Sequence, residues 1–262
     1  MKTMLPNKRM ILYELRNIKG NFFTLFFGIA FPIAFSILMP SIITRDLPES
    51  EQSKAIITVF VTMSMVIPMA VMLLGYAANY AQEVENDVPL RLDLFGVHPK
   101  KLFAAKLISH LIFITIAFIL YFLVDWFVLD IKMPATKTIV LWVSCLYLLA
   151  IIFFMMAHGI TTIVKKFGLT YAVTMFIYFA FMILCGMMGI TVEQLPKGLK
   201  SIALLFPMSY ISKDFVGIWD GGSYNFAPLV QSFIFLAAIA GILVLLGIRK
   251  SNRTQGIYQK ME

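Results

Sequence analysis

Two histidines are the side chains in this sequence best suited to proton chemistry. His110 and His158 both fall within long apolar stretches, and an imidazole can take up and release a proton near neutral pH. Either one could act as a proton relay inside a membrane. The alternative is a neutral histidine that is hydrogen-bonded to a neighbouring helix or lies near the membrane boundary. The residue types alone leave both interpretations open.

Motifs of catalysis and nucleotide binding are absent from the sequence. It has no G-x-x-x-x-G-K-[ST] loop for nucleotide phosphates, no G-x-S-x-G nucleophile turn and no H-E-x-x-H zinc motif. We therefore expect a chain that is not an enzyme and that binds no metal or cofactor by itself. Cys145 and Cys185 lie in separate apolar stretches, where buried apolar filler is the expected role.

Six apolar stretches must position these residues. The chain of 262 residues is 60% hydrophobic and only 14% charged, which excludes a soluble globular enzyme. Each stretch is close to or above the ~20 helical residues that cross a bilayer. No charged residue falls within them: 21–40, 55–78, 107–124, 138–164, 167–190 and 227–248. The sequence therefore predicts one all-α integral membrane domain, 1–262, with six transmembrane helices.

The positive charges predict how these helices are oriented. Fifteen of the 22 lysines and arginines fall on the side that holds both termini, and seven fall on the other side. Because positively charged loops stay in the cytoplasm, both termini are expected to be cytoplasmic. The net charge of +8 then reflects topology and contact with the lipid bilayer, and no nucleic-acid partner is expected. Residues 4–20 are basic and amphipathic, which predicts an interfacial helix at the inner surface.

Residues 79–106 form a long cytoplasmic segment with a predicted short helix over 86–95. Asp87 can cap this helix, Pro89 suits its first turn, and Gly96 would end it. Exposed leucine and phenylalanine on such a helix are typical of a docking surface for a partner, whereas the alternative is a solvated loop. The candidate docking residues are Glu83, Glu85, Asp87, Arg91, Leu92, Leu94 and Phe95.

Two polar stripes are candidates for a transport path. Thr170, Thr174 and Tyr178 follow one another at four-residue spacing on the fifth stretch, and Thr58 and Thr62 do so on the second. A polar stripe can line a wet cavity, or it can bond neighbouring helices together. No aspartate or glutamate lies within the six stretches. This disfavours an ion-coupled carrier and suggests that energy for transport enters from outside the membrane.

The segment between the fifth and sixth stretches is too short and too charged to span a membrane. Within 191–226, apolar residues recur at helical spacing but lysines interrupt them. An interfacial or re-entrant outer helix that stops near Pro207 is expected.

The order of these features resembles the membrane subunits of the ABC-2 class of ATP-binding-cassette transporters. In that family the loop between the second and third spans carries acidic residues, a short Arg-Leu-containing helix, a proline turn and a basic end. The corresponding residues here are Glu83, Glu85, Arg91-Leu92, Pro99 and Lys106. The outer segment is similar as well, in Leu195-Pro196, Leu199 and Phe206-Pro207-Met208-Ser209-Tyr210.

This resemblance implies a permease subunit of an ATP-driven exporter for an amphiphilic or apolar substrate, such as a peptide, a drug or a lipid-like molecule. Two six-helix halves, a second copy or a paralogue, would pair in a bacterial plasma membrane. A cytoplasmic ABC ATPase subunit would bind ATP and Mg²⁺ and push on a coupling helix at 86–95. Two other classes stay open: a self-sufficient secondary carrier or channel, and a non-transporting immunity or sensor subunit.

Overall fold

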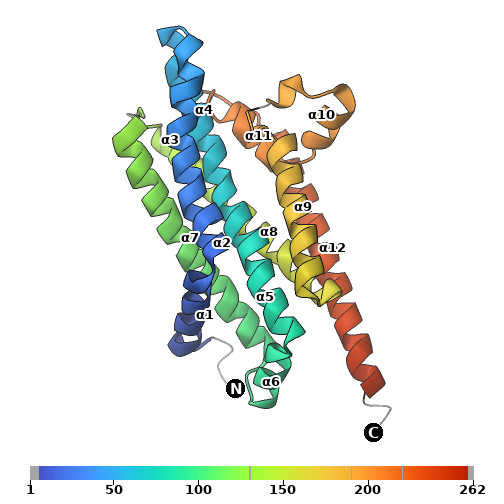
Figure 1. Cartoon of the computed structure of the whole chain (residues 1–262). Coiled ribbons are helices and arrows are strands. Elements are labelled where there is room, and N and C mark those ends of the chain that lie inside the picture. Colours follow the sequence, from blue (N-terminus) through green and yellow to red (C-terminus); the bar gives the residue numbers. More distant parts are fainter. Residues whose placement is uncertain (1–5, 130, 190, 220, 259–262) are drawn as a thin grey trace.

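The computed structural model describes residues 6–129, 131–189, 191–219 and 221–258, and this part of the chain is helical and has no strand. Six of its helices are long and apolar enough to cross a membrane (Figure 1). They are Phe22–Ile43, Glu49–Glu85, Pro99–Leu129, Thr136–Val164, Phe167–Leu184 and Ala227–Lys250. The predicted all-α fold with six spans is therefore confirmed. Lys2 and Lys260, which contribute to the predicted orientation, lie outside the described residues.

The first two spans each contain a π-helical segment. The first span consists of α2 (Phe22–Leu25), η1 (Phe26–Ala30) and α3 (Phe31–Ile43), and the second of α4 (Glu49–Pro68), η3 (Met69–Gly75) and α5 (Tyr76–Glu85). Pro68 ends α4 directly before its π segment, because proline lacks the N–H that continues a regular helix. The two segments pack closely: a Cβ atom on Gly28 would lie 2.6 Å from Cγ2 of Val71.

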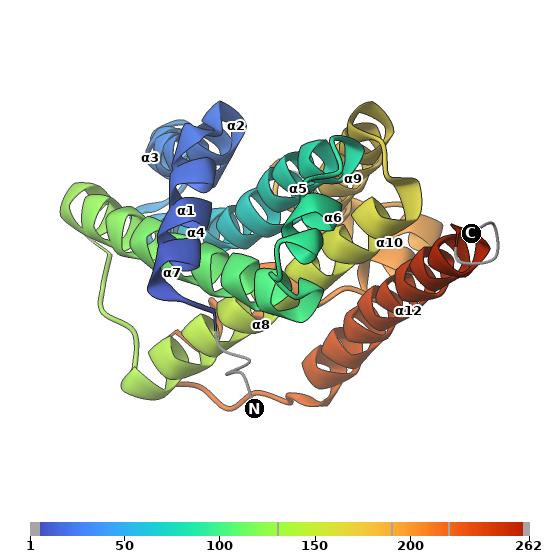
Figure 2. The ribbon, with the colours of Figure 1, turned by 90° about the horizontal axis from the view of Figure 1, so that it is seen from below.

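The second span lies at the centre of the bundle. Seen from the end that carries α6 (Val88–Leu94), α5 lies between α2 and α3 on one side and α9 (Phe167–Leu184) on the other (Figure 2). Two further long helices, α8 (Thr136–Val164) and α12 (Ala227–Tyr258), pack along each other. This arrangement surrounds the second span with protein, while the other five spans keep large exposed apolar faces.

The third span, α7 (Pro99–Leu129), is longer than the predicted 107–124. It therefore contains Lys106 near its start and Asp125 near its end, and both are buried. The helices that form the spans extend beyond the predicted apolar stretches and therefore include acidic residues, of which Asp125 is fully buried. The Ser36 hydroxyl on α3 donates a 2.8 Å hydrogen bond to Asp125 Oδ1, and this bond offsets part of the cost of burying the carboxyl group.

The short helices lie at the two ends of the bundle (Figure 1). One end of the bundle carries α1 (Lys8–Gly20), α6 and the C-terminal end of α12. At the other end lie η4 (Val192–Gln194), α10 (Lys197–Ala203) and α11 (Pro207–Asp214). The segment between the fifth and sixth spans is thus interrupted just before Pro207. A second helix begins at that residue, because proline suits a first helical turn.

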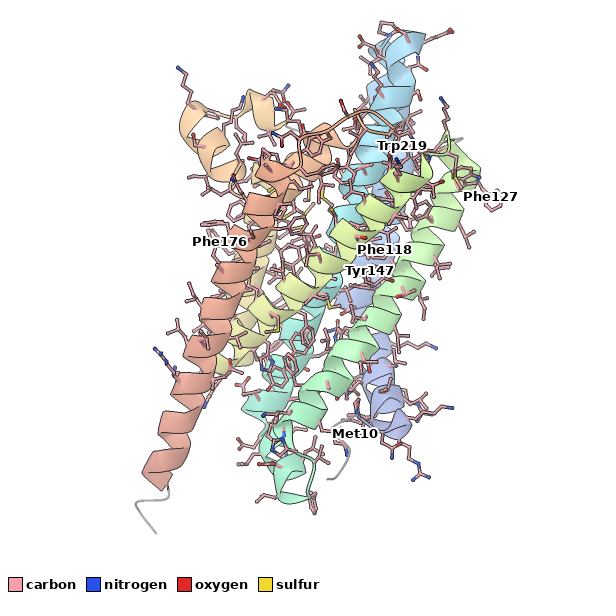
Figure 3. All side chains as sticks on the ribbon, turned by 180° about the vertical axis from the view of Figure 1, so that it is seen from behind. Met10, Phe118, Phe127, Tyr147, Phe176 and Trp219 are labelled. Carbon is pink, nitrogen blue, oxygen red and sulfur yellow. The ribbon has the colours of Figure 1, made fainter. Side chains whose placement is uncertain are left out.

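Aromatic side chains both fill the bundle and cover its outside. Phe118 on α7 and Tyr147 on α8 pack against each other, with ring centroids 5.8 Å apart, whereas Phe127 points away from the bundle (Figure 3). Exposed apolar side chains recur along the five spans that surround the second one. Such a surface suits contact with lipid or with a second membrane subunit, and not with water.

Candidate functional site

The helix α6 is joined to α5 by a turn at Asn86 and Asp87. Asp87 has a φ of 55°, and its carbonyl oxygen accepts a 3.0 Å hydrogen bond from the backbone N–H of Arg91. Asp87 occupies the position before the helix, as predicted, but its side chain makes no capping hydrogen bond. The Arg91 guanidinium folds back and donates to the Asn86 carbonyl oxygen. Arg91 therefore helps to hold this turn.

The apolar side chains of α6 are exposed. Leu94 is 80% and Phe95 is 85% exposed, whereas Leu92 is half-buried. Leu90, which was not among the predicted docking residues, is exposed as well. None of the seven residues of α6 is buried. The helix thus presents an apolar surface that the rest of the described chain does not cover.

Gly96 ends α6 with a backbone conformation that favours glycine. Its φ is 85°, and the N–H of Val97 donates a 2.9 Å hydrogen bond to the Leu92 carbonyl oxygen, which closes the helix end. We expect Gly96→Ala to lower the stability of this end by ~1 kcal/mol, because a Cβ disfavours positive φ. Gly168→Ala is the control, since Gly168 lies in α9 with open space around it. Protease sensitivity at residues 86–98 should rise only for Gly96→Ala, and equal sensitivity would contradict the prediction.

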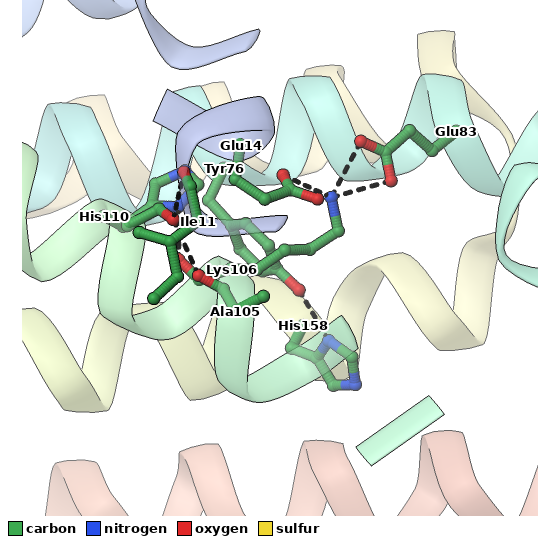
Figure 4. Close-up of polar contacts among 9 residues, drawn as sticks. Ile11, Glu14, Tyr76, Glu83, Ala105, Lys106, His110 and His158 are labelled. Atoms are coloured by element: carbon green, nitrogen blue, oxygen red, sulfur yellow. Dashed lines mark hydrogen bonds and ion pairs between the residues drawn. The ribbon is translucent and has the colours of Figure 1, made fainter. Parts of the chain in front are cut away.

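Glu83 points into the chain, where it joins an inner ion triad formed by Glu14, Glu83 and Lys106 (Figure 4). Both carboxylate oxygens of Glu83 lie 2.7 Å from Lys106 Nζ, and Glu14 Oε2 lies 2.9 Å from the same nitrogen. The side chains are 14%, 2% and 3% exposed for Glu83, Lys106 and Glu14, respectively. The triad therefore joins three helices: α1, α5 and α7.

The inner ion triad is electrostatically unbalanced, with one ammonium group facing two carboxyl groups. Burial raises the pKa of the Glu14 carboxyl, the charge of Lys106 opposes this rise, and the charge of Glu83 adds to it. The Tyr80 ring, whose centroid is 5.6 Å from Lys106 Nζ, adds a cation–π contact. Because a buried charge is costly without its partners, the triad fixes how α1 and α5 sit against α7.

Glu85 makes a second contact between α5 and a distant helix. Its Oε2 accepts a 2.8 Å hydrogen bond from the backbone N–H of Phe167, the first residue of α9. A carboxylate at this position also interacts favourably with the helix dipole. The two carboxylates predicted to meet a partner, Glu83 and Glu85, thus bind within the chain on both sides of α5. A displacement of α6 would act on α1, α7 and α9 through them.

The two polar stripes predicted for a transport path lie in different places. Thr58 and Thr62 line a cavity of about 440 Å³ next to α11. Thr170, Thr174 and Tyr178 are buried within the bundle, and the Thr174 hydroxyl donates to the Thr170 carbonyl oxygen at 3.0 Å. The stripes do not share a cavity among the described residues. That they line a transport path stays a prediction.

The histidines are held by contacts around Tyr76. His158 Nδ1 lies 2.7 Å from the Tyr76 hydroxyl, which joins α8 to α5. His110 Nδ1 lies 2.8 Å from the Lys106 carbonyl oxygen of its own helix, and its ring packs edge-on against Tyr76. These contacts favour hydrogen-bonded histidines that pack helices together over a proton relay.

Glu14 could not be identified as a site residue from the sequence. Its one visible signal is that it is the single acidic residue within the basic segment 1–20. Its partner Lys106 lies 92 positions away, so only the packing of α1 on α7 brings the two together. Lys106 itself was predicted only as the basic end of the 79–106 segment.

A comparison with known proteins places the chain in context. The family model described as "ABC-2 family transporter protein" matches residues 37–249, which include the end of the first span, the second to fifth spans and the sixth span up to Arg249. No curated protein matches the sequence.

Proposed function

The chain belongs to the ABC-2 transporter family, and we propose that it is the membrane half of an exporter whose ATPase subunit docks on α6. Family membership makes the chain a multi-pass permease subunit of an ABC transporter, which works with a separate ATPase. The proposal adds three points: the direction of transport is outward, the cargo is amphiphilic or apolar, and the coupling residues lie on and beside α6.

The exposed apolar surface of α6 is the observation that supports this docking site. Leu94 and Phe95 project from a seven-residue helix at the end of the bundle where α1 lies. Apolar side chains held in water at the tip of a short helix gain free energy when a partner groove covers them. Asp87 and Asp93, which are exposed on the same helix, can steer a positively charged groove towards it.

The contacts of α5 provide a route from α6 into the membrane helices. When the ATPase moves α6, Glu83 transmits the displacement to α1 and α7 through Lys106. Glu85 transmits it to α9 through the Phe167 N–H group. The packed helices would then rock as rigid elements, because their interior allows little continuous deformation.

The same end of the molecule is proposed to face the cytoplasm of a bacterial plasma membrane. It carries α1, α6 and the C-terminal end of α12, and it is the end with the larger number of lysines and arginines. ATP and Mg²⁺ would bind to the ATPase subunit. A second copy of this chain or a paralogue would supply the other six-helix half.

Docking is tested with the double variant Leu94→Asp/Phe95→Asp. We expect its affinity for the ABC ATPase subunit to fall at least ~100-fold, because two apolar anchors of ~2 kcal/mol each are lost. The measurement is co-purification and surface binding with the ATPase. Leu199→Asp/Ile202→Asp on α10 is the matched control, since these two apolar residues are also exposed but lie at the opposite end.

Undiminished binding and ATP-dependent transport by the α6 variant would overturn the proposed docking site. Transport by the purified chain alone, driven by an ion gradient in liposomes, would instead support a self-sufficient carrier.

A further inference from the structure

A cavity of about 610 Å³ opens beside the inner ion triad, between α1, α5 and α9. It was not among the predicted sites. Its wall combines one cation, several carboxamides and aromatic rings, and the residues that matter most are Arg16, Asn21, Phe23, Asn79 and Tyr171. The cavity lies where the amphipathic helix α1 meets the first span.

The carboxamides of the cavity wall are oriented by a chain of hydrogen bonds. Asn21 Oδ1 accepts a 3.2 Å bond from the Thr24 N–H, and Asn21 Nδ2 donates a 2.7 Å bond to Asn79 Oδ1. This chain uses the acceptor of each side chain and leaves Asn79 Nδ2 as a buried donor with no partner in the described chain. The buried Tyr171 hydroxyl has no partner there either.

The two charged side chains of the cavity wall, Arg16 and Glu83, differ in whether they already have a partner. Arg16 forms no ion pair or hydrogen bond with another described residue. Glu83 is the one carboxylate of the wall, and both of its oxygens are taken by Lys106. Free donors from Arg16, Asn79 and Tyr171 therefore face the cavity, and the one carboxylate among its described wall residues is already neutralised. A group rich in acceptor oxygens, such as a phosphate or a carboxylate, is the chemical complement of this wall.

An aromatic ladder leads from this cavity into the first span. Phe22 and Phe23 line the cavity, and their rings stack on Phe26 and Phe27 at centroid distances of 5.8 and 6.5 Å. Phe22, Phe23 and Phe26 are exposed to the surroundings of the bundle. A surface of this kind can accommodate an alkyl chain that lies along the span.

We infer that this cavity binds the headgroup of an anionic amphiphile, with a phosphate or carboxylate against Arg16, Asn79 and Tyr171 and an alkyl chain along the aromatic ladder. The inference rests on the proposed function for one point only, the assignment of this end to the inner leaflet. The amphiphile is either the cargo or a resident membrane lipid, because both sources offer the same headgroup chemistry.

The test uses the full chain in phosphatidylcholine nanodiscs and a dodecyl phosphate probe with a photoreactive diazirine in its alkyl chain. Mass spectrometry should locate the label within 22–27, which carry the aromatic ladder. Arg16→Gln is expected to lower the labelling ~10-fold, which corresponds to the loss of one charge-assisted hydrogen bond. Tyr171→Phe, which removes only the hydroxyl, should lower it a few-fold. Arg9→Gln is the matched control, since Arg9 is an exposed arginine on α1 outside the cavity.

Two results would overturn the inference. One is equal labelling by a dodecanol probe with the same diazirine, because that would show binding through the alkyl chain alone. The other is an equal loss for Arg9→Gln and Arg16→Gln, because that would show attraction to the basic surface of α1. Gel filtration of each variant confirms that the fold is retained, so a loss of labelling reports on the cavity.

The two sources are distinguished in liposomes that also contain the ATPase. If the amphiphile is cargo, ATP should speed the hydrolysis of the probe by an external phosphatase. If it is a resident lipid, ATP should not change the rate of probe hydrolysis, and the protein should still be labelled. Either result supports the binding site. The labelling experiment needs neither ATP nor the ATPase, so it can fail while docking on α6 succeeds, and the reverse also holds.

Discussion

Replacing Lys106 with methionine is expected to lower the free energy of unfolding by about 3–5 kcal/mol, enough to reduce the amount of folded protein sharply. Methionine fills the same space but leaves the carboxyl groups of Glu14 and Glu83 buried beside each other without a cation. The measurement is the amount of protein that survives heating and gel filtration. Lys100→Met is the control, because Lys100 is exposed on the same helix.

The loss should be reversible by removing the charges that Lys106 compensates. The triple variant Lys106→Met/Glu14→Gln/Glu83→Gln is expected to recover most of the stability, since a neutral buried group does not need a counter-ion. Its coupling between α6 and α7 should stay impaired, so ATP-driven transport should not recover with stability. A triple variant that is as unstable as Lys106→Met would show that packing, and not charge, explains the effect.

The Lys106→Met variant is also expected to become more stable as the pH falls. Burial already raises the pKa of Glu14 above its usual value of 4.5, and Lys106 is the group that opposes this rise. Without Lys106 the folded-state pKa rises further above the unfolded value. The stabilising effect of protonation is then fully present below about pH 4.5 and is lost as the pH rises through the folded-state pKa. The melting temperature of the variant should therefore be higher at about pH 5 than at about pH 7.5, and an unchanged melting temperature would contradict this prediction.

The spans could be predicted from the sequence because the bilayer imposes a simple rule. A charge-free apolar stretch of sufficient length has few alternatives to a membrane helix, and each of the six stretches is helical over most of its length. The same rule placed the ends of the third span incorrectly. Lys106 and Asp125 lie inside α7 because side chains from other helices bind them, and no local pattern of charge or hydropathy reports such partners.

The position of the helix α6 was predicted from the sequence, but the contacts of the acidic residues before it were not. The proline and glycine signals located α6, since Pro89 and Gly96 act through local backbone geometry. The role of each acidic residue depends on contacts between distant helices, and Glu83 and Glu85 therefore turned out to bind within the chain. The cavity beside Arg16 was missed for the same reason, because its wall comes from three separate segments.

The contact between α8 and α12 carries the second large prediction, Gly159→Ala. A Cβ atom on Gly159 would lie 2.6 Å from the carbonyl carbon of Leu243 and 2.7 Å from the N atom of Val244. Both are backbone atoms, so the new methyl group can be accommodated only if the two helices move apart. We expect a loss of about 3 kcal/mol or more, at the upper end of the cost of overpacking, and little folded protein.

Two glycines on α12 provide a graded comparison for this prediction. A Cβ atom on Gly247 would meet the hydroxyl end of the Thr162 side chain, which can rotate, so Gly247→Ala should cost ~1 kcal/mol. Nothing lies within 4 Å of a Cβ atom on Gly241, so Gly241→Ala should be neutral or slightly stabilising. Folded yield after solubilisation should follow the order Gly241→Ala, Gly247→Ala, Gly159→Ala. Because the clash at Gly159 is with backbone, adding Leu243→Ala should not restore it, and a rescue by that change would show that α12 does not pack on α8 this closely.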